Sequence, residues 1–383
     1  MRYLSLSLFA LILASCATTP EKPAREHLSL TPASFSDLDG WADDDHAAAL
    51  TAFIHSCHAL ENKAADASMG VAGKIAAWQW ACTGAEKAPQ GDEAAARTYF
   101  ETWFRPFAAA GRDGDEGLFT GYYAPELNGS LTQGGAFQTP LYARPADLIS
   151  VDLGAFKTEL KGQHIVGKVA GSKLTPYDDR TEIAQGSLAN RAQPIAWIDD
   201  PVGAFFLEVQ GSGRVRLSDG TLIPVGYDGA NGRAYVAIGH IMSERGDIQR
   251  PVTMPGIRAW LAAHPQQAQQ VMNENPSYVF FRKLPNDNIV GAEGIPLTDG
   301  RSMAVDSAYV PLGVPLWLET YDGQGAKLRR LMVAQDTGGA IKGPVRGDFF
   351  WGSGAEAGVQ AGAMQSRGKY FLLLPKTSSP SDD

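Results

Sequence analysis

The chain has 383 residues and a formal net charge of −9. This length allows two domains of ordinary size, and the acidic balance argues against a nucleic-acid-binding protein. The 42 glycines and 23 prolines are spread along the chain, which favours a β-rich protein with many tight turns over a low-complexity one.

The first residues have the pattern of a secretory signal. Arg2 precedes an apolar run from Leu4 to Ala14 that is too short to cross a bilayer as a helix. The run leads into Ser15-Cys16, and Leu13 to Cys16 resembles the lipobox of bacterial lipoproteins, in which the cysteine is acylated. An ordinary cleaved signal with a chance cysteine is the alternative. We expect residues 1–15 to be the signal peptide and Cys16 to carry the lipid, palmitate included.

The residues after Cys16 indicate where the lipid would hold the protein. Ala17, with no aspartate at that position, resembles the pattern that sorts Gram-negative lipoproteins to the outer membrane. Several acyl chains would anchor the chain firmly, so we expect it on the outer membrane, facing the periplasm. Residues 16–26 have the composition of a flexible tether.

A helical pattern follows, from residue 27 to about residue 107. Apolar residues recur at helix spacing after acidic starts at Asp45 and Asp92. Cys57 and Cys82 are the cysteines that remain beyond Cys16, and an even pair in an exported protein predicts a disulfide. Two buried free thiols are the alternative.

Beyond Gly117 the chain changes to short apolar runs separated by Gly, Asp and Pro, which are typical of strands. The predicted strands are residues 118–125, 195–198, 204–210 and 222–225, followed by 278–281 and 370–374. Helical periodicity returns over 256–272, and the polar tail 377–383 is expected to be disordered. The strands do not alternate regularly with helices and no internal repeat is present, which excludes a doubly wound sheet and favours a β-barrel with added helices.

Three aspartates stand in apolar, glycine-rich runs near the C-terminus: Asp306, Asp336 and Asp348. A carboxyl group that loses solvation has a raised pKa and can stay protonated near neutral pH, as a general acid must. Any one of them could instead accept backbone hydrogen bonds at a turn. Asp336-Thr337-Gly338 also matches the aspartic-protease signature, but such enzymes need two aspartates that share a proton.

Other segments suggest a carbohydrate-binding surface. Aromatic residues such as Tyr122, Tyr123 and Tyr278 can stack on sugar rings, although aromatic residues in strands are more often core. The small residues Gly211 to Gly213 would let a ligand approach the backbone, or form a plain hairpin turn. The sequence has no CxxC, no HExxH and no grouped histidines, so we expect no metal and no cofactor.

Together these segments resemble the MltA-type membrane-bound lytic murein transglycosylase family. The segments that carry the resemblance are 121–123, 177–183, 205–213, 275–282 and the three-aspartate block from 294 to 354. The resemblance implies a mainly β protein with a helical N-terminal part: a double-psi β-barrel domain (27–139 plus 276–376), interrupted by a smaller β-barrel domain (140–275), with a groove between them.

The resemblance also implies an exolytic peptidoglycan lytic transglycosylase, a carbon–oxygen lyase that cleaves between N-acetylmuramic acid and N-acetylglucosamine and leaves a 1,6-anhydromuramyl end. It implies Asp348 as the essential acid, with Asp336 assisting it and Asp306 securing a barrel turn. The residues expected to contact the glycan are Tyr122, Tyr123, Gln210, Gly211, Ser212, Tyr278, Arg282 and Asp306. We expect a monomer, with a cell-wall synthesis or hydrolysis complex as a further partner. A non-catalytic peptidoglycan-binding lipoprotein and an aspartic-type peptidase are the alternatives.

Overall fold

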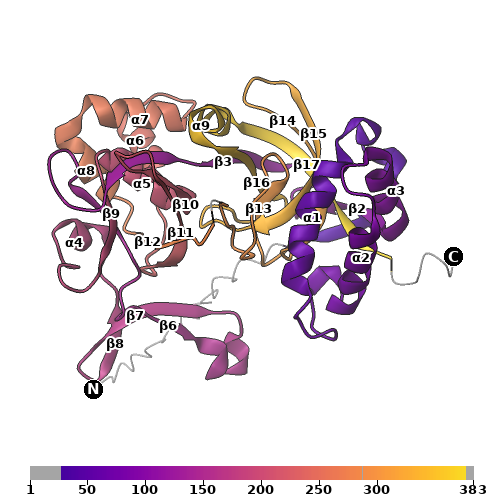
Figure 1. Ribbon diagram of the computed structural model, residues 1–383, viewed down its shortest axis with the longest axis horizontal. Helices are drawn as coiled ribbons and strands as arrows, with labels where there is room; N and C mark the ends of the chain where they lie inside the picture. The colour runs from indigo at the N-terminus through magenta and orange to yellow at the C-terminus, as the bar shows by residue number, and fades with distance from the viewer. Residues whose placement is uncertain (1–26, 287, 377–383) are drawn as a thin grey trace, which may run out of the picture.

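The computed structural model describes residues 27–286 and 288–376. The expected signal peptide, the lipidation of Cys16, the tether and the C-terminal tail therefore lie outside the described residues. Three sheets and nine α-helices make up the described part (Figure 1). Short 3-10 helices occupy Phe35–Asp37, Trp41–Asp43, Gly70–Ala72, Leu153–Ala155 and Thr158–Leu160.

The N-terminal helices pack together beside the largest sheet, at one end of the molecule (Figure 1). They are α1 (His46–Leu60), α2 (Ile75–Lys87) and α3 (Glu93–Trp103). Asp45 and Asp92 cap α1 and α3, because each carboxylate accepts a hydrogen bond from a backbone N–H of the first turn. A disulfide joins Cys57 of α1 to Cys82 of α2, which confirms the predicted pairing.

Eight strands form the largest sheet. They are β1 (Ser29–Pro32), β2 (Phe104–Ala110), β3 (Gly117–Ala124), β13 (Ser302–Val305), β14 (Pro315–Tyr321), β15 (Lys327–Asp336), β16 (Arg346–Ser353) and β17 (Gln365–Pro375). Because β17 pairs with both β14 and β3, six of them close into a ring in the order β17-β14-β15-β13-β16-β3. We call these six strands the ring. The double-psi connections remain a prediction.

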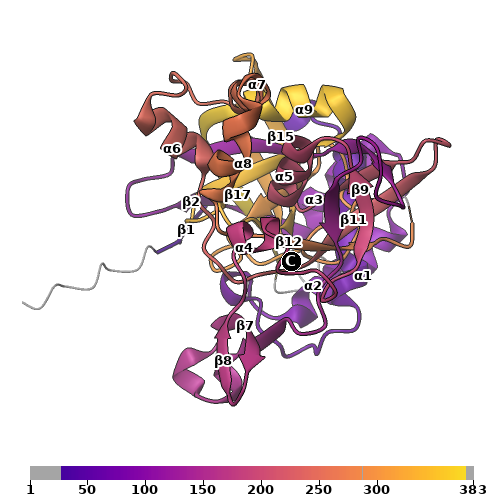
Figure 2. The same ribbon diagram turned by 90° about the vertical axis from the view of Figure 1, so that its left-hand side faces the viewer.

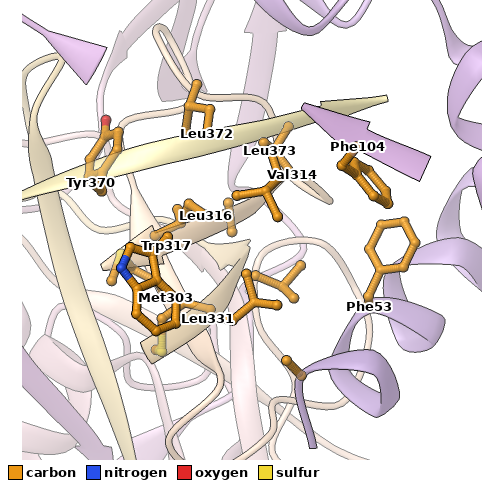
Figure 3. Packing of buried hydrophobic residues seen from close by; sticks show 14 of the residues in the cluster. Phe53, Phe104, Met303, Val314, Leu316, Trp317, Leu331, Tyr370, Leu372 and Leu373 are labelled. Carbon is orange, nitrogen blue, oxygen red and sulfur yellow. The ribbon is translucent and has the colours of Figure 1, made fainter. Parts of the chain in front are cut away.

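The ring and helix α1 share one hydrophobic core. Trp317, Leu316 and Leu331 are fully buried between the strands, and Phe53 of α1 meets Phe104 of β2 edge to face at 5.5 Å between ring centroids (Figure 3). Helix α9 (Gly354–Ala363) follows β16 and packs against it and β3. The N-terminal helices are therefore part of the packed body and not a separate appendage.

A second sheet lies at the other end of the molecule (Figure 1). Its order is β12 (Val279–Lys283), β11 (Leu222–Ala230), β10 (Ser212–Arg216), β4 (Glu126–Ser130), β9 (Pro194–Ile198) and β5 (Thr139–Tyr142). A bridge between Ala143 and Phe281 brings its two outer strands together. The helices around it are α4 (Arg180–Ala184), α5 (Pro201–Gln210), α6 (Ile238–Arg245), α7 (Met254–Ala263) and α8 (Pro265–Asn273).

The third sheet is a small arm that projects from the second sheet in both views (Figures 1 and 2). It consists of β6 (Ile149–Asp152), β7 (His164–Ala170) and β8 (Lys173–Pro176), all antiparallel. The second sheet includes β4 and β12, so its strands extend past both ends of the predicted insert 140–275. On the N-terminal side this sheet begins just after Pro125, because β4 pairs with β10; the domain boundaries themselves remain a prediction.

Several sequence expectations are wrong in detail. Residues 204–210 form helix α5 and not a strand: Pro201 occupies the first turn and Gly211 ends the helix with φ +80°. The sequence pattern predicted a strand because α5 is buried on nearly every side, so its apolar residues do not recur at the spacing of an amphipathic helix. The helical stretch 256–272 divides at Pro265 into α7 and α8. The predicted helical N-terminal part also contains β1 and β2, so the fold is a mixture of helices and sheets.

Candidate active site

Asp348 lies on β16, between two neighbouring strands of the ring. It is in register with Ala304 of β13 and with Thr120 of β3. The Thr120 hydroxyl donates a hydrogen bond of 2.5 Å to Asp348 Oδ1, and Arg346 Nη2 donates one of 2.8 Å to the Thr120 hydroxyl. The carboxyl group is therefore held by a chain of two side chains, both presented by strands of the same ring.

The surroundings of Asp348 act on its protonation in two directions. Burial raises the pKa of Asp348 above its usual value, while the charge of Arg346 and the hydrogen bond from Thr120 oppose that rise. Burial favours a proton on the carboxyl group, and Arg346 favours the carboxylate once the proton has left. A group in this position can both give and accept a proton.

Asp336 ends β15 and faces the same cavity as Asp348. Its Oδ1 accepts hydrogen bonds from the backbone N–H groups of Ala292 at 2.8 Å and Thr337 at 2.9 Å. Burial raises the pKa of Asp336 to about 6; these N–H groups oppose the rise and the charge of Asp348 adds to it. Both aspartates that were predicted to be catalytic therefore lie together, with Asp336 fixed by backbone.

Tyr122 completes this cavity, which has a volume of about 110 Å³. Its hydroxyl is buried and interacts with the Asp336 carboxyl, whose pKa it lowers. Burial and the charges of Asp336 and Asp348 raise the pKa of Tyr122 well above its usual value, so the hydroxyl stays protonated and can donate. Tyr122 also lines the cavity that Asp336 and Asp348 share.

Tyr123, the next residue, lies on the opposite face of β3 because side chains alternate along a strand. It lines a different cavity of about 440 Å³ between α7 and α9, where Gly358 leaves room for its ring. Its backbone N–H still donates a hydrogen bond of 3.1 Å to Gln210 Oε1. The structure thus places Tyr122, and not Tyr123, beside the two aspartates.

A larger cavity of about 630 Å³ adjoins the one at Asp348 and lies between the ring and the second sheet. Val209, Gln210 and Asp336 line both cavities. We call the side made by residues 290–307 and 336–342 the ring wall, and the side made by residues 208–212, 226–228 and 279–284 the second-sheet wall. Together the two cavities form a groove that leads to Asp348.

The predicted residues Gln210, Gly211, Ser212 and Arg282 all line this groove. Gln210 to Ser212 reach it because α5 ends at Gly211, where the chain turns into β10. Tyr278 does not join them: it packs against Phe280 and lines a separate cavity of about 250 Å³ behind α5.

Asp306 is placed at a turn and not among the residues that line the groove. Its Oδ1 accepts a hydrogen bond from the N–H of Ala308 at 3.2 Å, and its Oδ2 accepts one from Gly343 at 2.9 Å. It therefore ties the end of β13 to the loop before β16.

A buried ion pair orients the second-sheet wall. Arg180 of α4 binds Glu208 of α5 through two hydrogen bonds, of 3.1 and 2.8 Å, and both side chains are nearly inaccessible. Arg180 Nε also donates to the backbone carbonyl of Asn275 at 2.9 Å. This pair links α4, α5 and the start of β12.

Sequence reasoning missed Thr120, Arg346 and the role of Arg180. Thr120 could have been suspected, because it lies two residues before Tyr122 and so on the same face of a strand. Among the residues that the structure describes, no group of three or more His, Cys, Asp or Glu could hold a metal ion. Nor does any helix in that part of the chain have the length and apolar character needed to cross a bilayer.

Two protein families match successive parts of this chain. The MltA specific insert domain matches residues 118–282, and the 3D domain matches residues 301–374. Membrane-bound lytic murein transglycosylase A of Vibrio cholerae is 32% identical over 265 residues, and that of Escherichia coli K12 is 32% identical over 264 residues. Each match covers 67% of this chain but only 65% of the curated relative.

Solved structures resemble the chain over nearly its whole length. The membrane-bound lytic murein transglycosylase of Agrobacterium tumefaciens is 33% identical with a TM-score of 0.82, covering 91% of this chain and 98% of the other. MltA of Neisseria gonorrhoeae is 35% identical with a TM-score of 0.78, covering 92% and 94%. E. coli MltA with bound chitohexaose is 26% identical with a TM-score of 0.62, covering 91% of each chain.

Proposed function

Because this chain belongs to the MltA family of membrane-bound lytic murein transglycosylases, we propose that it cleaves peptidoglycan glycan strands between N-acetylmuramic acid and N-acetylglucosamine. The observation that carries the proposal is the buried carboxyl of Asp348, which Thr120 holds and Arg346 influences at the inner end of a groove. The structure of an E. coli relative with bound chitohexaose supports a sugar strand as the occupant of such a groove.

The reaction that we propose needs only one acid. Ordinary glycosidases use two carboxylates, one as acid and the other as nucleophile or base. Here the 6-hydroxyl of the muramic acid serves as nucleophile, and such an intramolecular group acts at a very high effective concentration. Protonated Asp348 donates its proton to the leaving glycosidic oxygen as the bond from that oxygen to C1 breaks.

The second half of the reaction returns the proton. O6 attacks C1, and the Asp348 carboxylate accepts the proton from O6. The product is a 1,6-anhydromuramyl end and no water is consumed. Arg346 stabilises the carboxylate between the two transfers, and burial keeps the pKa of Asp348 raised. Asp336 and Tyr122, which line the same cavity, would bind hydroxyl groups of the sugar.

We further propose that Cys16 carries the lipid that holds the enzyme on the outer membrane, facing the periplasm. The working form would be a monomer that acts on chain ends, alone or within a cell-wall complex. The peptidase alternative gains no support from the geometry, because Asp306 is tied to Gly343 and does not line the groove with Asp336.

The test is mass spectrometry of soluble products after the full chain, kept in detergent, is incubated with purified murein sacculi. Wild type should release anhydromuropeptides, and Asp348→Asn should lower the rate by about 10³-fold or more. Asp306→Asn is the control that should retain turnover. Reducing ends would mean that water is the acceptor, and binding without release by wild type would favour the non-catalytic alternative.

A further inference from the structure

Two exposed cations lie on opposite walls of the groove. Arg282 of β12 belongs to the second-sheet wall and Lys342 to the ring wall, and both line the cavity of about 630 Å³. In the described part of the chain, neither side chain forms an ion pair or a side-chain hydrogen bond. Unpaired cations are ordinary on a protein surface, but these two face a cavity that holds the substrate in the proposed function.

The acidic groups of the same cavity leave these cations available. Glu208 is already neutralised by Arg180, and Asp336 accepts the backbone N–H groups of Ala292 and Thr337. Asp228 also lines the cavity and is half-buried, and no ion pair joins it to either cation among the described residues. An anionic ligand placed between Arg282 and Lys342 would find a cation on each side.

The glycan strand itself offers few anions. Its N-acetylglucosamine units are neutral, so its negative charge lies on the lactyl group at O3 of each muramic acid, as a free carboxylate or as carboxylates of the peptide attached there. Resting on the proposed function, we propose that Arg282 and Lys342 form a subsite for this carboxylate-bearing substituent. The subsite would distinguish muramic acid from N-acetylglucosamine by charge.

Such a subsite would set the register in which the glycan strand binds in the groove. The two sugars alternate, so a strand that slides by one unit presents the wrong bond to Asp348, and the sugar then lying at the acid lacks the lactyl group. A charged contact at a fixed position would favour every second register. Charge complementarity of this kind contributes more to specificity than to affinity.

Binding by the inactive Asp348→Asn chain tests the subsite without turnover. The probes are tetrasaccharides of alternating N-acetylglucosamine and N-acetylmuramic acid, with and without peptide, and chitotetraose, measured by titration calorimetry. We expect Arg282→Gln and Lys342→Gln each to weaken binding of a lactyl-bearing probe by about 2–5-fold, and chitotetraose binding to stay unchanged. Added salt should reduce the difference in affinity between wild type and these variants. Arg282→Lys should bind the lactyl-bearing probe nearly as tightly as the chain with Arg282.

Lys173→Gln is the matched control, because this exposed lysine lies on β8 of the projecting arm. An effect on the peptide-bearing probe alone would assign the carboxylate to the peptide, and an effect on the peptide-free probe would assign it to the lactyl group. Equal losses for chitotetraose, or no loss for any probe, would overturn the subsite. Product formation by the wild-type chain shows separately whether the proposed reaction stands.

Discussion

The two walls of the groove are stabilised in different ways. The ring wall is held by strand pairing on both sides of Asp348 and by backbone N–H groups that bind Asp336. The second-sheet wall is also made of paired strands, β10 to β12, and it is further tied to helices α4 and α5 by the buried ion pair between Arg180 and Glu208. The comparison indicates that the ring wall relies on neutral backbone hydrogen bonds, whereas the second-sheet wall also contains a buried pair of charges.

The largest expected effect comes from breaking the ion pair of the second-sheet wall. Arg180→Met leaves the Glu208 carboxylate buried without a counter-charge, with only the Val279 N–H as a donor to it, which should lower the free energy of unfolding by about 3–5 kcal/mol. Urea unfolding followed by circular dichroism measures this. Arg216→Met is the matched control, because the Arg216–Glu126 pair joins β10 to β4 of the second sheet but is more exposed. Its loss should lower the free energy of unfolding by less than about 1 kcal/mol.

A double variant sharpens that prediction. Arg180→Met combined with Glu208→Leu removes both charges and should recover most of the lost stability, because the buried unpaired carboxylate is gone. If Arg180→Met alone is as stable as wild type, the second-sheet wall does not depend on the pair.

The next effect concerns Asp348, on strand β16 of the ring. Arg346→Gln removes the positive charge that stabilises the Asp348 carboxylate, so kcat should fall by about 10–100-fold. Because Arg346 lowers the pKa of Asp348, its loss should raise that pKa and shift the alkaline limb of the pH–rate profile upward. Arg367→Gln, an exposed arginine on β17, should change neither.

A third prediction concerns how the stability of the ring wall depends on pH. Glu293 lies beside Ala292 and accepts a hydrogen bond of 2.7 Å from Ser56 of α1, and burial raises its pKa from 4.5 to about 7. The folded state therefore favours the protonated form, so stability should be highest below pH 4.5 and fall as pH rises towards and through 7. Glu293→Gln should be more stable than wild type above that range by about 3 kcal/mol.

Thermal melts across this pH range measure the effect. The two proteins should agree at the acidic end, and Glu244→Gln on the exposed face of α6 should follow the wild-type curve throughout. A Glu293→Gln curve parallel to that of wild type would contradict the prediction.

The smallest effect is expected at Asp306. Asp306→Asn can keep only one of the two backbone hydrogen bonds that the carboxylate accepts, so it should lose about 1 kcal/mol of stability. Turnover should stay within about threefold of wild type, because Asp306 acts through a turn and not on the sugar. A loss comparable to that of Asp348→Asn would place Asp306 in the reaction itself.

Parts of the fold could be predicted from short sequence patterns that act locally, such as helix caps. The capping acids Asp45 and Asp92 marked two helices correctly, and the cysteine pair was correct. Helix α5 was misread because burial on nearly all sides removes the periodicity that distinguishes a helix from a strand. The extent of the second sheet was missed because β4 and β12 join it only through long-range pairing.

The site was predictable to the same extent. Asp336 and Asp348 could be found because an acid in an apolar run is unusual in itself. Thr120 could not be paired with Asp348 from sequence, since 228 residues separate them and only the register of β3 against β16 brings them together. Tyr123 was expected in the groove because the sequence pattern did not show which face of β3 each tyrosine occupies.

Strand β3 belongs to the ring, and β4 belongs to the second sheet, yet only Pro125 separates them. The two halves of the molecule are thus joined by a nearly uninterrupted length of extended backbone. Thr120, which binds Asp348, lies on the same stretch of chain as β4, an inner strand of the second sheet. The position of Thr120, and with it the hydrogen bond to Asp348, is therefore connected to the second sheet through a few residues of extended chain.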